Sequence, residues 1–108
     1  MQESDWKVLS KLRPLAVERM YDRIFFHLQS TLNAEEKSHR EAVIDTLETV
    51  RAAMKEVSRV FDQVRFSRTN ASDHLITYFA ENLLTEQELA EFSEDAQELV
   101  SSWRAQKH

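Results

Sequence analysis

The chain has 108 residues, of which 42% are apolar and 31% charged, and its formal net charge is −5. This balance is typical of a globular protein, and the length predicts one domain, residues 1–108. The absence of cysteine excludes disulfides, thiolate zinc sites and a cysteine nucleophile. No segment approaches the ~18 consecutive apolar residues of a membrane-spanning helix, so we expect a cytoplasmic protein without membrane association.

The chain contains no glycine, and its one proline is Pro14. Strand hairpins, phosphate-binding loops and dinucleotide folds use glycine where φ is positive or where the backbone approaches a ligand. Helices can instead end on asparagine, and Asn33 and Asn82 are placed for that role. The composition therefore predicts an all-α protein, an antiparallel bundle of three or four helices.

The first predicted helix has an apolar stripe at helical spacing, formed by Val17, Met20, Tyr21, Ile24, Leu28 and Leu32. Pro14 lacks an N–H and crowds the preceding turn, so it must lie in the first turn or kink the helix. We place the start near Ser10, or near Ser4 if the helix is kinked. Leu15 and Phe26 share the side opposite the stripe, which predicts an additional interface there.

The second predicted helix spans about residues 34–66 and has the most regular pattern. Alternating spacings of four and three residues connect Val43, Leu47, Val50, Met54, Val57, Phe61 and Val64. Asn33 and Glu36 have the spacing of a capping box at its start. This helix would be roughly 50 Å long, whereas a compact chain of this length has a diameter of about 35 Å. We therefore expect a homodimer that forms a multi-helix bundle through Leu47, Met54, Val57 and Phe61.

The third predicted helix begins after the polar residues 67–70. One of its faces carries Ala71, Leu75, Tyr78, Phe79 and Leu83. Neither glycine nor proline separates it from the second helix, so the two helices can also be continuous.

The C-terminal third is acidic. Residues 69–103 contain no lysine or arginine against eight aspartates and glutamates. This pattern argues against nucleic acid as a ligand, and it suits either a basic protein partner or solubility alone.

The segment LLTEQELAEF, residues 83–92, is similar to the start of the entering helix of an EF-hand. Thr85 followed by Glu88 forms a capping box, which explains the segment as a helix start. An EF-hand needs a twelve-residue loop with glycine at its sixth position, and no glycine follows. We therefore predict no calcium site, and a helix that runs to about residue 103 or bends slightly at Ser93.

Residues 83–93, LLTEQELAEFS, resemble the C-terminal end of some short bacterial helical proteins of unassigned function. The resemblance implies no catalytic residue. It indicates a bacterial cytoplasmic protein.

Glu36 and His39 match the carboxylate–imidazole spacing of di-iron bundles. Those sites need the pair twice with two further glutamates, and this sequence holds one pair. Ser72, Asp73 and His74 have the residue types of a catalytic triad, but neighbours on a helix point about 100° apart and cannot relay a proton. These patterns predict no metal, no cofactor and no enzymatic activity.

The function that remains is a non-catalytic protein-interaction or regulatory module, such as an adaptor, an inhibitor or a chaperone-like protein that self-associates. A ligand- or metal-binding helical bundle is the alternative interpretation.

We expect millimolar calcium or zinc to change neither the far-UV circular dichroism nor the melting temperature. The physical reason is that the sequence has neither a glycine-bearing calcium loop nor a set of thiolates. A saturable rise in melting temperature with either ion would contradict this interpretation.

Overall fold

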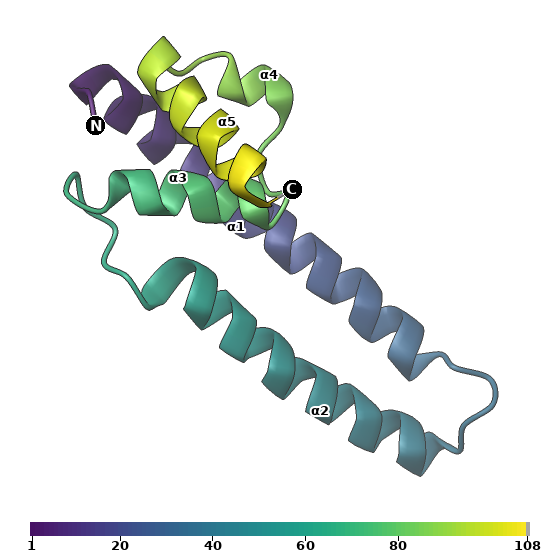
Figure 1. Ribbon diagram of the computed structural model, residues 1–108. Coiled ribbons are helices and arrows are strands. Elements are labelled where there is room, and N and C mark those ends of the chain that lie inside the picture. The colour runs from purple at the N-terminus through teal and green to yellow at the C-terminus, as the bar shows by residue number, and fades with distance from the viewer. Residues whose placement is uncertain (108) are drawn as a thin grey trace.

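The computed structural model describes residues 1–107, and this part of the chain is helical with no strand (Figure 1). The elements in chain order are α1 (Glu3–Leu32), α2 (His39–Val57), the π-helix η1 (Ser58–Asp62), α3 (Ala71–Ala80), α4 (Glu86–Leu89) and α5 (Glu94–Lys107). The prediction of an all-α bundle is confirmed. Within residues 1–107, no helix combines the length and the apolarity that crossing a membrane requires.

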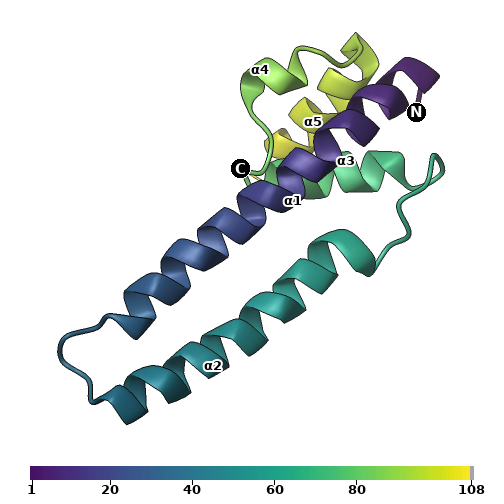
Figure 2. The same ribbon diagram turned by 180° about the vertical axis from the view of Figure 1, so that it is seen from behind.

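The molecule is elongated because α1 and α2 form an antiparallel hairpin that extends beyond the other helices (Figures 1 and 2). α3 packs against α1 and α5 near the N-terminal end of α1. We call residues 21–56 the arm and the other described residues the body. The described chain measures 53 × 27 × 22 Å, and its radius of gyration is 16.9 Å. A compact chain of this length has a radius of gyration of roughly 13 Å.

α1 is the longest helix, with 30 residues, and it continues through Pro14. It starts at Glu3, which agrees with the earlier of the two expected starts. Pro14 is exposed, so its ring displaces no core side chain. The single long helix predicted over residues 34–66 is wrong, because α2 covers only His39–Val57 and the longest helix is α1.

α2 begins later than predicted because Ser38 caps it. Ser38 Oγ accepts the backbone N–H of Glu41 at 3.1 Å and donates to Oε1 of Glu41 at 3.0 Å. Asn33 instead ends α1, where its backbone N–H donates to the carbonyl of Gln29 at 3.1 Å. Serine and asparagine are both good helix caps, and the residues between them are used to reverse the chain. α2 gives way to η1 after Val57, so the helical segment also ends earlier than predicted.

The predicted signals between α3 and α4 are confirmed. Residues 63–70 separate η1 from α3, so the second and third helices are not continuous. Asn82 follows α3 with φ of 57°, the left-handed conformation of a helix stop. Thr85 caps α4: its Oγ1 accepts the N–H of Glu88 at 3.1 Å, and Glu88 Oε1 accepts the N–H of Thr85 at 2.8 Å.

The helix predicted from Glu86 to about residue 103 is two helices, because Asp5 of α1 breaks it. The carboxylate of Asp5 is buried and accepts the backbone N–H of Ser93 at 2.7 Å and its hydroxyl at 2.6 Å. Ser93 Oγ accepts the N–H of Ala96 at 3.3 Å, in the manner of an N-cap for α5. A residue far away in the sequence thus converts the expected slight bend into a break.

The hydrophobic core lies in the body. Its least exposed members are Leu9, Ala16, Ala71, Leu75, Tyr78, Leu83 and Val100. Within the arm, residues 21–56, Ala42 is the one buried residue. The arm therefore has almost no core of its own.

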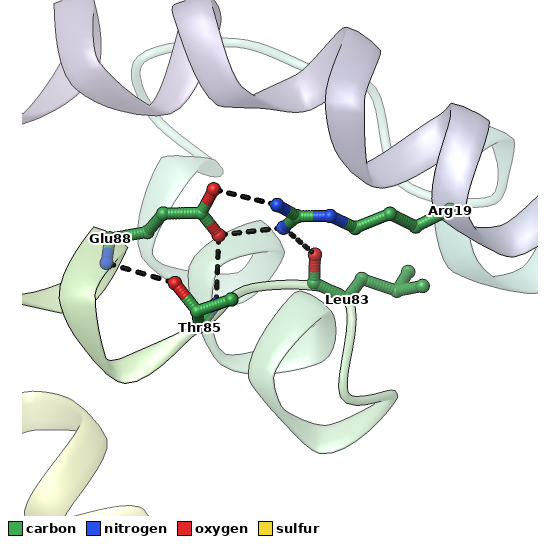
Figure 3. A network of polar contacts seen from close by, with 4 residues as sticks. All are labelled: Arg19, Leu83, Thr85 and Glu88. Carbon is green, nitrogen blue, oxygen red and sulfur yellow. Dashed lines mark hydrogen bonds and ion pairs between the residues drawn. The ribbon is translucent and has the colours of Figure 1, made fainter.

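Arg19 of α1 joins the base of the arm to the link between α3 and α4 (Figure 3). Its guanidinium donates to the two carboxylate oxygens of Glu88 at 2.6 and 2.9 Å, and to the carbonyl of Leu83 at 2.8 Å. Glu88 also completes the capping box with Thr85, so one carboxylate holds the start of α4 and ties it to α1. The hydrogen bond from Arg19 is the main reason why the pKa of Glu88 lies below its usual value.

We expect Glu88→Gln to lower the free energy of unfolding by about 2 kcal/mol at pH 7, because it removes charge-assisted hydrogen bonds from a largely buried carboxylate. A carboxyl with a lowered folded-state pKa stabilises the fold above its unfolded pKa, and this contribution disappears as the pH falls through the folded pKa. Urea unfolding at pH 7 and pH 3 should show that the gap between wild type and variant narrows at pH 3.

Glu91→Gln is the control, because Glu91 pairs with Lys11 on the exposed surface, where an ion pair contributes little. An equal gap between wild type and Glu88→Gln at both pH values would show that the charge of Glu88 is not what stabilises this contact.

Candidate interaction surface

Large apolar side chains are exposed along the arm. On α1 they are Tyr21, Phe25, Phe26 and Leu32, and on α2 they are Val43, Ile44, Leu47 and Met54. Phe25 is 58% exposed and Val43 is 59% exposed. Scattered exposed apolar residues are normal, but a contiguous group marks an interaction site. What matters is therefore which of these eight side chains share one side of the hairpin.

α2 faces α1 with small residues, which is why its larger ones remain exposed. Ala42, Thr46, Thr49 and Ala53 recur at helical spacing and are buried or half-buried. Small side chains let the two helices approach closely, and they leave little apolar surface between them. Val43, Leu47 and Met54 lie next to this contact line, about a quarter-turn or slightly more around the helix.

On α1, the exposed stripe is rotated away from the side that faces α2, in the same sense around the helix axis as on α2. Ile24, Leu28 and Thr31 are half-buried residues on the side of α1 that faces α2. Tyr21 and Phe25 lie about a quarter-turn further around, viewed along the chain direction. For two antiparallel helices, displacements in the same sense fall on the same side of the plane that contains both axes.

The two stripes therefore form one surface. We call it the arm face and define it by Tyr21, Phe25, Leu32, Val43, Leu47 and Met54. It runs along the hairpin where no other helix covers it (Figures 1 and 2).

The structure places the residues predicted to form an interface on different surfaces. Leu47 and Met54 belong to the arm face. Leu15 and Phe26 are also exposed, Phe26 by 65%, but helical periodicity places them on the outer side of α1, away from α2. That side remains a predicted second surface.

Val57 and Phe61 require a correction, because they are 7% and 4% exposed and belong to the core of the body. The ring of Phe61 lies 5.4 Å from that of Tyr78 on α3. The apolar stripe of α2 thus changes role along its length: it is exposed in the arm and buried where α3 covers it.

Four residues of the arm face were not expected at an interface. Tyr21 and Leu32 were predicted on the apolar stripe of the first helix and Val43 on that of the second, and Phe25 was not assigned. The sequence does contain a signal for them, because Tyr21 and Phe25 make the apolar side of α1 wider than a single helix contact needs. A second apolar contact is one explanation for such a width.

A buried polar cluster lies in the body between α1 and α3. Arg13 donates to the hydroxyl of Tyr78 at 2.8 Å and to the carbonyl of Phe61 at 3.1 Å. The hydroxyl of Tyr78 lies 3.2 Å from Nδ1 of His74, whose Nε2 lies 3.2 Å from the carbonyl of Arg65. Burial raises the pKa of Tyr78, against the opposing effect of Arg13.

The hydrogen bonds of this cluster define the tautomer of His74. The Arg65 carbonyl can only accept, so Nε2 of His74 carries a proton and Nδ1 accepts from Tyr78. Both ring nitrogens of His74 are then occupied, and neither is available to act as a base on a substrate. The ring nitrogens of His74 thus contact Arg65 and Tyr78 rather than Ser72 or Asp73.

The structure separates Glu36 and His39, the pair with the carboxylate–imidazole spacing. Glu36 lies in the connection before α2, whereas His39 is the first residue of that helix, so the two do not share a helical face. Within residues 1–107, no three histidine or acidic side chains come together as a metal site would require.

We expect Val57→Asp to unfold the protein and Leu47→Asp to leave its melting temperature nearly unchanged. The first substitution places a charge in the core, whereas the second lies on an exposed surface of the same helix. Thermal unfolding followed by circular dichroism at low micromolar concentration measures both. Similar losses in the two variants would contradict the division of the α2 stripe into a buried and an exposed part.

No protein-family model, no curated protein and no solved structure matches this chain.

Proposed function

We propose that this protein is a non-catalytic interaction module that forms a homodimer through the arm face. The observation that carries the proposal is the arm face itself, six large apolar side chains on one side of a hairpin without a core of its own. We further propose that the protein acts in the bacterial cytoplasm.

The size of the arm face supports a protein partner. A large apolar residue presents on the order of 200 Å², so six that are about half exposed present roughly 600 Å². This area lies at the upper end of the range for the largest apolar patch on an ordinary monomer, about 300–600 Å². A standard interface buries about 800 Å² on each partner. The arm face would supply most of the area of such an interface, and a polar rim around it would supply the rest.

A second copy of the chain fits the shape of this surface. Two helical hairpins that pack face to face form a four-helix bundle, an arrangement in which each hairpin buries the apolar side of the other. A two-fold dimer uses the same patch on both subunits, so it needs no second surface of different composition. The arm would thus acquire in the dimer the core that it lacks in the single chain.

The acidic C-terminal third offers less support for a basic partner. Glu81, Glu86, Glu88 and Glu91 already pair with Arg59, Arg104, Arg19 and Lys11 of the same chain. A basic partner at this segment would have to compete with these internal pairs. We therefore place the principal interaction on the arm face.

We expect wild-type protein at tens of micromolar to have twice the chain mass of 12.7 kDa in light scattering behind a sizing column. A variant with Phe25→Ser and Leu47→Ser should have the monomer mass, because it removes apolar contacts from the middle of the arm face of both subunits. Its circular dichroism spectrum should stay that of wild type, since both residues are exposed in the single chain.

Phe26→Ser is the matched control. Phe26 is the sequence neighbour of Phe25 and is at least as exposed, but it lies on the outer side of α1. This variant should remain a dimer. A monomer mass for wild type would refute the proposal. Dissociation by Phe26→Ser, with no effect of the double variant, would show that the interface lies on the outer side of α1 instead.

A further inference from the structure

Charged residues of opposite sign flank the arm face on its two long edges. Glu18 and Asp22 follow the apolar stripe of α1 on the side away from α2, and Arg51 and Lys55 follow that of α2 on the side away from α1. All four are exposed. Among the described residues 1–107, none of the four takes part in an ion pair, although seven other ion pairs are present.

The acidic and basic residues lie at matching heights along the hairpin. Asp22 lies ten residues before the end of α1 and Arg51 twelve residues after the start of α2. At 1.5 Å per residue, these positions are roughly 15 and 18 Å from the tip of the arm. Glu18 and Lys55 are each four residues further from the tip, so their offset is the same. The two acidic residues therefore lie within one helical turn of the two basic residues in height.

Two symmetric arrangements bring two arm faces together, and the charges distinguish them. If the two-fold axis is perpendicular to the helices, α1 lies over α1 of the second copy, and each edge meets an edge of its own sign. If the axis is parallel to the helices, α1 lies over α2 of the second copy, and the acidic edge meets the basic edge. Because the heights are preserved in the second arrangement, residues at matching heights become neighbours.

We propose that the two arms pair in parallel, with both bodies at the same end, and that Asp22 pairs with Arg51 of the second copy and Glu18 with Lys55 of the second copy. This inference rests on the proposed dimerisation through the arm face and adds its geometry. Apolar contacts provide the affinity, and the charged edges select the orientation, since like charges placed side by side oppose the other arrangement.

Charge reversal tests the pairing. Asp22→Arg and Arg51→Asp should each raise the dimer dissociation constant at least about tenfold, because each creates two like-charge contacts per dimer. The variant with both substitutions should return to within a few-fold of wild type, because it exchanges the signs of the paired edges. Dissociation constants come from sedimentation equilibrium at low salt, and circular dichroism checks that each variant is folded.

Glu98→Arg is the matched control, because Glu98 is an exposed acid on α5 of the body, outside the arm. It introduces the same change of charge as Asp22→Arg and should leave the dissociation constant unchanged. A loss as large as that of Asp22→Arg would show that net charge, rather than pairing, controls association.

A distance measurement tests the orientation independently. The chain has no cysteine, so Lys7→Cys at the exposed N-terminal part of α1 accepts a single spin label. With the arms in opposite directions, the two labels would lie roughly 60 Å apart. The parallel arrangement keeps both at the same end, and pulsed dipolar spectroscopy should give a clearly shorter distance.

The outcomes separate this inference from the proposed function. Suppose that the double variant Phe25→Ser and Leu47→Ser dissociates the dimer while neither single charge reversal weakens it. That result would support the arm face as the dimer interface and would refute the parallel pairing. A label distance near 60 Å would refute it as well. A monomeric wild-type protein would refute both.

Discussion

α1 is longer than the body that packs against it, and the rest of the architecture depends on this mismatch. The buried residues of α1 end at Met20, and the twelve residues that follow contain none. Glycine and proline favour the end of a helix, and neither occurs between Met20 and Asn33. α1 therefore extends out of the body, and α2 returns along it. The exposed arm is the direct consequence.

The junction between arm and body is held by arginines of α1 that donate to backbone carbonyls at or just beyond the ends of other elements. Arg13 donates to the carbonyl of Phe61, Arg19 to that of Leu83 and Arg23 to that of Glu81. The last carbonyls of a helix lack partners within it, so such donors stabilise helix ends. The spacing of these arginines along α1 thus sets where the arm leaves the body.

The arm face was only partly predictable. Leu47 and Met54 follow from the apolar period of α2, but the same period continues into Val57 and Phe61, which are buried. Periodicity identifies one side of a helix and does not say what covers it. That depends on α3, which packs near η1 and leaves the rest of α2 uncovered. The exposure of Phe25 depends in the same way on the absence of a third helix beside the arm.

The sequence by itself determined the all-α class, through a composition without glycine. It also determined the stop at Asn82 and the capping box at Thr85, because both depend on residues within about one turn of each other. Only the tertiary structure decided the break before α5 and the start of α2. Asp5 reaches Ser93 across 88 residues, and this contact has no trace in the local pattern. Asn33 and Ser38 are both competent caps, and the choice between them follows from where the hairpin has to reverse. Local hydrogen-bonding chemistry can be read from neighbouring residues, whereas competition between equivalent local signals is resolved by packing.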